Sequence, residues 1–198
     1  MVKNLIRSLT TSGFLLGILL PSSAIAQTSG TVVSVGDGDT IRVRNPSGET
    51  KTIRLACIDS AELKQAPHGE QARQRLQQII PVGTSVSLKP QTTDRYGRTV
   101  AEVFKGTLNV NLALVQEGRA VAYRQYLGQC DAARYLAVED SARQRRLAFW
   151  SQVDPIMPWD FRKGIRAKVQ PKPTLSVPKT ATPSRSGCDR SYPDVCIP

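Results

Sequence analysis

The sequence predicts an α+β domain in which five strands form a small antiparallel barrel packed against three helices. Three observations support this fold class. Short β-rich segments alternate apolar and polar residues, so that each strand would bury one face. Clusters of Gly, Asn, Asp and Pro separate these segments, as turns do. Longer segments carry apolar residues three and four positions apart, which is typical of amphipathic helices.

The five predicted strands cover residues 31–35, 40–44, 50–58, 84–88 and 99–104. The second strand alternates apolar and basic residues, as a strand with one buried face does. In the third strand, Ile53, Leu55 and Cys57 share one face. Arg54 therefore points to the opposite face. The fifth strand is entered from the tight segment Asp94–Arg98.

The three predicted helices cover residues 69–80, a short segment around 112–115, and residues 131–149. The first helix ends at Pro81-Val82-Gly83. Asn109 or Asn111 can cap the second helix, and Gly118 closes it. Elements in this order suit a five-stranded antiparallel OB-like barrel packed against three helices, although periodicity alone does not single out that solution.

The first 26 residues predict an exported protein. Lys3 and Arg7 precede a short apolar run, and a small-x-small motif ends at Ala26, as in a signal peptide. The apolar run is too short to span a bilayer. We therefore expect cleavage near Ala26 and a secreted, periplasmic or cell-envelope location.

The predicted organisation is a signal peptide over 1–26, a folded domain over 27–160, a linker over 161–187 and a tail over 188–198.

The predicted linker differs from the domain in composition. Residues 161–187 contain seven Lys or Arg, four Pro and no Asp or Glu, which favours a solvated, extended segment. The whole chain has a formal net charge of +11 at pH 7. This charge suggests a polyanionic partner, which can be nucleic acid, anionic lipid or acidic wall polymer, and charge alone does not choose among them.

Four cysteines remain after the predicted cleavage site. An even number of cysteines in an exported protein favours two disulfides. Cys188 and Cys196 are close in a turn-rich stretch, which predicts that they close the tail and leaves Cys57 and Cys130 as partners. Zinc is the competing interpretation, but the chain has no C-x-x-C pair and only one histidine, His68. We expect His68 to be a surface residue.

Two acidic segments follow strand ends. Asp39 lies in the turn after the first strand, and Asp59 lies at the end of the third. Each segment alone has an ordinary interpretation, since Asp-Gly is common in hairpin turns and acidic residues cap helices. If both carboxylates meet at one rim of the barrel, they and a backbone carbonyl can hold a hard cation. Arg54 and Arg98 can bind phosphate, because the planar guanidinium donates two parallel hydrogen bonds.

These segments, in this order, resemble the thermonuclease (staphylococcal-nuclease-like) family. The likeness covers about Gly30 to Ser151, and it places such a domain at 27–160. The matching segments are Asp37-Gly38-Asp39-Thr40, Arg54-Leu55, Ile58-Asp59-Ser60-Ala61-Glu62, Asp94-Arg95-Tyr96-Gly97-Arg98, Leu114-Val115-x-x-Gly118-x-Ala120 and Glu139…Ala142-Arg143…Leu147…Trp150.

The resemblance implies a role for each matching residue. Asp39, Asp59 and the backbone carbonyl of Ser60 would hold one Ca²⁺. Glu62 would orient or deprotonate the attacking water. Here Ala61 stands where the family usually has Pro, so the loop that carries Glu62 lacks the stiffness of a Pro.

The remaining implied roles concern the substrate. Arg54 and Arg98 would bind the phosphate, and Arg95, Tyr96 and Tyr123 would line the nucleotide site. The family cleaves DNA and RNA, prefers single strands and leaves 3′-phosphates. We therefore expect a monomeric, Ca²⁺-dependent nuclease without a membrane span. The alternatives are an inactive nucleic-acid-binding barrel, which the presence of the arginines and Glu62 disfavours, and a Ca²⁺-binding wall-associated protein.

Overall fold

The computed structural model describes residues 28–166. The predicted signal peptide, most of the linker and the Cys188–Cys196 tail lie outside these residues. The strands are β1 (Thr28–Val35), β2 (Thr40–Arg44), β3 (Thr50–Leu55), β4 (Ile58–Ser60), β5 (Ser85–Thr93), β6 (Thr99–Lys105), β7 (Leu108–Asn109) and β8 (Ala120–Ala122). The α-helices are α1 (His68–Ile79), α2 (Val110–Gln116), α3 (Ala132–Gln144) and α4 (Pro158–Arg162), with 3₁₀ segments at Arg124–Gln129 and Ala148–Ser151.

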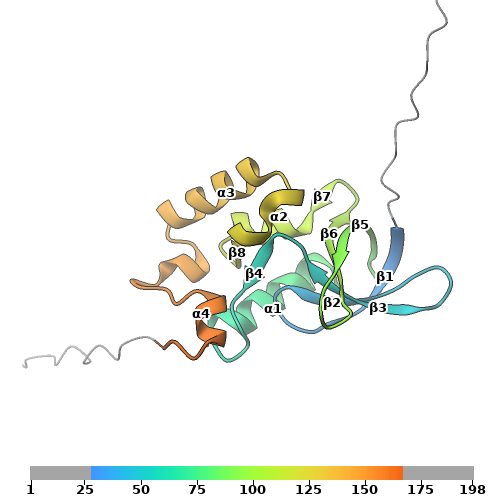
Figure 1. Cartoon of the computed structure of the whole chain (residues 1–198), viewed down its shortest axis with the longest axis horizontal. Helices are drawn as coiled ribbons and strands as arrows, with labels where there is room; N and C mark the ends of the chain where they lie inside the picture. Colours follow the sequence, from blue (N-terminus) through green and yellow to red (C-terminus); the bar gives the residue numbers. More distant parts are fainter. Residues whose placement is uncertain (1–27, 167–198) are drawn as a thin grey trace, which may run out of the picture. The chain divides into compact units, whose positions relative to one another are not determined.

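A closed five-stranded barrel forms the larger part of the domain (Figure 1). Its strands follow the order β3-β2-β1-β5-β6, and a further pairing of β3 with β6 closes the ring. The OB-like α+β fold is therefore confirmed, but its strands are mixed rather than purely antiparallel, because β3 and β6 run parallel. Parallel neighbours need a long connection, and the chain through β4, α1 and β5 supplies it.

The predicted third strand is two strands. β3 ends at Leu55, and Cys57 adopts a positive φ of 66°, after which β4 leaves the barrel and pairs with β8. The buried side chain of Asn111 stabilises the break by donating to the carbonyl oxygens of Ala56 and Ala101 at 2.9 and 3.2 Å. Cys57 keeps the spacing of Ile53 and Leu55, which favoured one continuous strand, but Ala56 is buried as well, so the alternation of buried and exposed residues ends at Leu55.

The helices pack against the barrel near the positions that the sequence predicts, with differences at the C-terminal side. Asn109 caps α2 by accepting the N–H of Leu112. Helix α3 ends at Gln144, earlier than predicted, and the 3₁₀ turn Ala148–Ser151 follows it. Helix α4 was not predicted, and it reaches Arg162, two residues into the segment expected to be linker. Figure 1 shows α4 beside β4.

Apolar side chains from the barrel and from α1 to α3 form one core, which includes Val32, Ile41, Ile53, Leu76 and Leu114. A disulfide joins Cys57 to Cys130, the pair expected from the sequence, and so ties the break after β3 to the start of α3. Within residues 28–166, no helix has the length and apolar character that crossing a membrane requires.

Candidate functional site

Asp39 and Ser60 bring the turn between β1 and β2 against strand β4. The backbone N–H of Ser60 donates a 2.7 Å hydrogen bond to Oδ2 of Asp39, and both residues are buried. Gly38 permits this approach, since a Cβ there would lie 2.6 Å from Ser60 Oγ and 2.7 Å from the Cβ of Ala72. Asp37 stabilises the turn by accepting the N–H of Asp39 at 3.0 Å. Close packing of the turn beside Asp39 therefore requires a residue without a Cβ at position 38.

Arg54 on β3 connects the two acids. Its Nη2 lies 3.0 Å from Oδ2 of Asp39 and donates to Oδ1 of Asp59 at 2.9 Å. Its Nη1 donates to the carbonyl oxygens of Leu55 and Ile58 at 2.8 and 3.1 Å. Only 14 % of the Arg54 side chain is exposed. Most of its donors therefore bind protein atoms, and its main effect is to hold Asp39 and Asp59 at one rim of the barrel.

Glu62 lies in the turn that follows β4. Its backbone N–H donates to Oε1 of Gln65 at 2.9 Å, and the N–H of Gln65 donates back to the Glu62 carbonyl at 2.7 Å. Gly69 lets the start of α1 pack on this turn, because a Cβ at Gly69 would collide with the Glu62 carbonyl oxygen. These contacts hold the turn although Ala61 replaces a Pro.

Arg162 of α4 completes the acidic centre, and sequence reasoning missed it. Its Nη1 and Nη2 donate to Oδ1 and Oδ2 of Asp59 at 3.0 and 2.7 Å, and Nη1 also donates to Oε1 of Glu62 at 2.7 Å. Composition assigned this arginine to a solvated linker. Phe161, an aromatic residue at the start of the predicted linker, and Trp159 just before it were the signal that could have identified a packed helix.

Arg98 and Tyr96 lie on the turn between β5 and β6. Asp94 holds this turn: its Oδ1 accepts the N–H groups of Tyr96 and Arg98 at 2.9 and 3.0 Å, and its Oδ2 accepts Nε of Arg98 at 2.7 Å. The guanidinium groups of Arg95 and Arg98 lie 4.9 and 5.5 Å from the centre of the Tyr96 ring, which is 69 % exposed as a residue. Among the described residues, no acceptor binds the two terminal nitrogens of Arg98, so its fork is available to a ligand.

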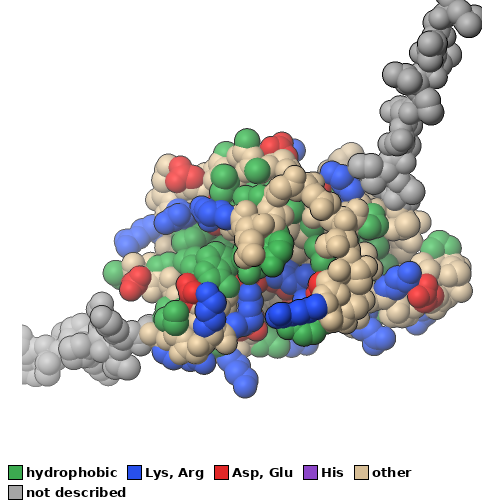
Figure 2. All heavy atoms as spheres, viewed as in Figure 1, with side chains coloured by type: hydrophobic (Ala, Val, Ile, Leu, Met, Phe, Trp, Pro, Cys, Tyr) green, Lys and Arg blue, Asp and Glu red, His purple; other side chains and the backbone are tan. Residues whose placement is uncertain are grey.

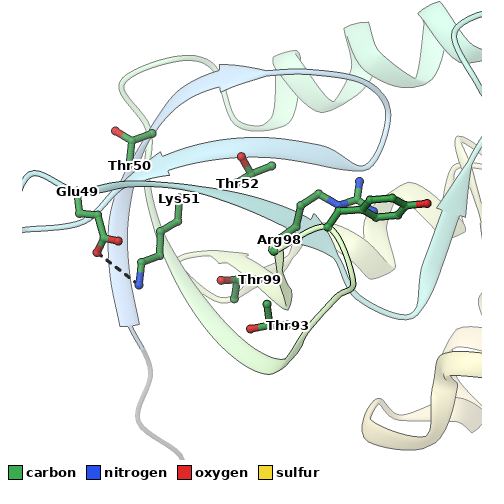
Figure 3. Close-up of a pocket in the computed structure, with 9 residues that line it drawn as sticks. Glu49, Thr50, Lys51, Thr52, Thr93, Arg98 and Thr99 are labelled. Atoms are coloured by element: carbon green, nitrogen blue, oxygen red, sulfur yellow. Dashed lines mark ion pairs between the residues drawn. The ribbon is translucent and has the colours of Figure 1, made fainter.

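A groove of about 440 Å³ runs from Arg98 along β3. Arg98 lies at one end of the groove, and the ion pair between Glu49 and Lys51 lies at the other (Figure 3). The remaining lining residues are Thr50, Thr52, Thr93, Tyr96, Gly97 and Thr99. The walls between the charged ends are therefore rich in hydroxyl groups, which can donate hydrogen bonds to phosphate oxygens.

Tyr123 follows β8 and belongs to an aromatic cluster. Its ring stacks on Trp159 of α4 with the centroids 5.2 Å apart and an angle of 12° between the planes, and it meets Tyr126 edge to face. Its backbone N–H donates to the carbonyl of Cys57 at 2.9 Å. The break after β3 thus positions Tyr123 as well as the acids.

Burial raises the pKa of two carboxyl groups at the acidic centre, Asp37 in the β1–β2 turn and Asp59 in β4. Burial, together with the neighbouring charge of Asp39, raises the pKa of Asp37 to about 6. Burial also raises the pKa of Asp59, and the hydrogen bonds from Arg162 oppose that rise. Arg162 in turn has its pKa raised by its hydrogen bonds to Asp59 and Glu62. The buried carboxylate of Asp59 is thus accompanied by the guanidinium groups of Arg54 and Arg162.

The structure brings Asp39, Arg54, Asp59, Ser60 and Glu62 together: Arg54 contacts both Asp39 and Asp59, and Arg162 contacts Asp59 and Glu62. Arg95, Tyr96 and Arg98 form a second group on the β5–β6 turn, and no hydrogen bond within residues 28–166 joins the two groups. The parallel pairing of Arg54 with Val100 nevertheless places the strand of Arg54 beside β6, which begins directly after Arg98. Figure 2 shows Lys and Arg side chains recurring over this face, from the region of α4 towards β2 and β3.

The donor set suits a hard cation, although the described residues contain no group of three or more His, Cys, Asp or Glu side chains placed to hold a metal. Asp39 and Asp59 are 5 % and 0 % exposed, and both carboxylates converge on the positive charge of Arg54. Carboxylate oxygens and a backbone carbonyl are ligands that Ca²⁺ prefers. The residues present therefore fit such an ion.

Several known proteins are similar to this chain in amino-acid sequence. The family described as "Staphylococcal nuclease homologue" matches residues 52–152. A micrococcal nuclease of Shigella flexneri is 37 % identical over 158 residues, which cover 75 % of this chain and 88 % of the relative. An uncharacterized endonuclease of Haemophilus influenzae is 31 % identical over 155 residues, covering 78 % and 84 %. Endonuclease YhcR of Bacillus subtilis is 30 % identical over 165 residues, covering 75 % of this chain and 14 % of the relative.

Proposed function

Since the chain belongs to the staphylococcal nuclease family and is a hydrolytic nuclease, we propose that it is an exported, Ca²⁺-dependent enzyme that cleaves DNA and RNA. Single strands are its preferred substrate, and its products carry 3′-phosphates. One observation supports the proposal above all: Arg54 holds Asp39 and Asp59 within hydrogen-bonding reach of a single nitrogen, at 3.0 and 2.9 Å. Two buried acids are kept side by side only where something offsets their repulsion.

The acid pair is the proposed metal site. Asp39, Asp59 and the backbone carbonyl of Ser60 would hold Ca²⁺. The ion, when bound, supplies positive charge that lowers the repulsion between a phosphodiester and an incoming nucleophile. Ser60 is held to Asp39 through its backbone N–H, so the three ligands belong to one hydrogen-bonded unit.

Glu62 is the proposed base for the attacking water. Its side chain is 37 % exposed, so a water molecule can reach it, and it lies close enough to Asp59 to share the Arg162 guanidinium. Glu62 accepts a proton from the water as the water oxygen bonds to phosphorus. The bond from phosphorus to the 5′-oxygen breaks, the 5′-oxygen takes up a proton, and the phosphate stays on the 3′ side.

The arginines and aromatic residues bind the substrate in this proposal. Arg98 has an available fork that can donate two hydrogen bonds to the phosphate and stabilise its developing charge. Arg54 contributes a fixed positive charge beside the same centre. The exposed ring of Tyr96, with the Arg95 guanidinium 4.9 Å from its centre, offers a flat surface on which any base can stack. Tyr123, whose ring already stacks on Trp159, lines the nucleotide site together with that ring.

Incubation of the purified protein with single-stranded DNA, duplex DNA and RNA tests the proposal, with Ca²⁺ or with a chelator. We expect cleavage only with Ca²⁺, faster cutting of single strands, and 3′-phosphate ends identified by mass spectrometry. Glu62→Gln is the matched control, since it keeps the size of the side chain. Products with 5′-phosphates, or equal rates in the chelator, would refute the proposal. Fractionation of expressing cells, with sequencing of the mature N-terminus, tests export and the cleavage site near Ala26.

A further inference from the structure

Helix α4 is anchored beside the acid pair. Met157 and Trp159 pack with a buried apolar cluster that includes Ala61, the residue just before Glu62. The side chain of Gln65 donates to the carbonyl of Ile156 at 3.0 Å, which ties the segment before α4 to the Glu62 turn. These contacts fix the position of the helix on the domain. They therefore also hold its last residue, Arg162, next to Asp59 and Glu62.

Arg162 binds acceptor oxygens of two of the three acids, Asp59 and Glu62. It binds both oxygens of Asp59, and one of its nitrogens also binds Glu62. Oδ1 of Asp59 additionally accepts Nη2 of Arg54, so the buried carboxylate is surrounded by guanidinium groups. Arg54 is only 14 % exposed, whereas Arg162 is 41 % exposed. Of the two arginines, Arg162 is the one that can move into solvent.

We propose that Arg162 is a tethered competitor of the divalent cation and sets the affinity of the acid site for metal. This inference rests on the proposed function, because it takes Asp59 as a metal ligand. A guanidinium and a hard cation use the same carboxylate lone pairs. Binding of the cation therefore requires Arg162 to leave Asp59, and the same movement releases Glu62 for the water.

The strength of the competition depends on how often Arg162 is in place. The apparent affinity for a ligand falls by the fraction of molecules in which its site is free. A contact that is formed about 90 to 99 % of the time weakens cation binding about ten- to a hundredfold. The stack of Trp159 on Tyr123 favours high occupancy, since it fixes the helix that carries Arg162.

Direct measurement of Ca²⁺ binding by titration calorimetry, on the full mature chain without nucleic acid, tests this inference. Arg162→Gln removes the competing group and should lower the dissociation constant for Ca²⁺ about ten- to a hundredfold, as the occupancies above imply. Arg162→Lys keeps the charge but loses the planar fork, so its dissociation constant should lie between those of Arg162→Gln and the parent protein.

Arg166→Gln is the matched control. Arg166 lies four residues further on, and its guanidinium donates to the carbonyl oxygens of Phe161 and Ile165 instead of to the acids. Removing its charge should change the dissociation constant less than twofold. A comparable tightening in Arg166→Gln would show that only general charge matters, and it would overturn the inference. Thermal melts of each variant check that the fold is retained.

The remaining outcomes separate this inference from the proposed function. If the parent protein binds Ca²⁺, Asp39→Asn does not, and Arg162→Gln binds no more tightly than the parent, the metal site stands and the role of Arg162 is refuted. If neither the parent nor any Arg162 variant binds Ca²⁺ at millimolar concentration, both proposals fail.

Discussion

The side chain of Asp39 accepts a 2.7 Å hydrogen bond from the backbone N–H of Ser60, and this contact joins the β1–β2 turn to strand β4. It joins two proposed metal ligands, one in a turn of the barrel and one in the separate two-stranded sheet of β4 and β8. Any change that moves the turn away from β4 should therefore affect both stability and metal binding.

Gly38→Ala should separate this pair. Its new Cβ would lie 2.6 Å from Ser60 Oγ and 2.7 Å from the Cβ of Ala72, so the turn must shift. Overpacking of this kind costs about 1–3 kcal/mol in the free energy of unfolding. We expect a lower melting temperature and weaker Ca²⁺ binding. Gly128→Ala is the control, because nothing lies within 4 Å of a Cβ there. Equal stability of the two variants would contradict the close packing.

Arg98→Lys should cut more slowly than the parent protein. Lysine keeps the charge but loses the fork and the 2.7 Å bond from Nε to Asp94. Removal of one preorganised charge-stabilising donor lowers the rate by on the order of 10²–10³. Single-turnover cleavage of a short oligonucleotide measures this effect. Arg134→Lys, on the exposed surface of α3, should leave the rate unchanged. Equally mild effects of both substitutions would remove Arg98 from the proposed site.

Asp39→Asn and Glu62→Gln should fail in different ways. Loss of the Asp39 charge weakens metal binding, so high Ca²⁺ should partly restore cleavage. Glu62→Gln cannot accept the proton, and its rate should fall by about 10²–10⁴ at every Ca²⁺ concentration. Rates measured across a Ca²⁺ titration distinguish the two patterns. Rescue of Glu62→Gln by Ca²⁺ would indicate that Glu62 binds metal rather than protons.

His68 should make stability depend on pH. It is half-buried and meets Phe149 edge to face at 5.8 Å, so the prediction of a surface residue was incomplete. Burial, with a smaller effect of Arg119, lowers its pKa below the ordinary 6.5. The unfolded chain therefore binds a proton before the folded one does, and stability is lost as the pH falls from above 6.5 through the folded pKa.

Urea unfolding of the parent protein and His68→Gln at pH 7.5, 6.5 and 5.5 measures this contribution. The difference in free energy of unfolding between the two proteins should shift in favour of the variant as the pH falls. A difference that stays constant across these pH values would show that His68 has the same pKa in both states.

Removal of residues 167–198 should leave the chemistry intact. Every proposed site residue, and Arg162, lies before this segment. A chain that ends at Arg166 should therefore keep its turnover number on short oligonucleotides. A fall of more than about tenfold, equivalent to roughly 1.4 kcal/mol in activation free energy, would mean that the removed segment contributes to the site.

Much of the barrel could be predicted because local patterns encode it. The alternation in 40–44 and the helical spacing in 69–80 correspond closely to β2 and α1, since both periods follow directly from backbone geometry. The break at Cys57 and the parallel pairing of β3 with β6 could not be predicted in this way. Both depend on partners that are distant in sequence, such as Asn111 and Ala101. The pattern of residues within one segment does not specify such partners.

The sequence by itself determined the family and the identity of the acids, arginines and aromatic residues proposed for catalysis, because these occur as short motifs in a fixed order. Only the tertiary structure decided which charges meet. Arg54 is engaged by the acids, whereas the two terminal nitrogens of Arg98 have no acceptor among residues 28–166. Arg162 reaches Asp59 across 103 residues of chain. The partner of a guanidinium depends on where the folded backbone places each carboxylate, and composition around residue 162 carries no information about that position.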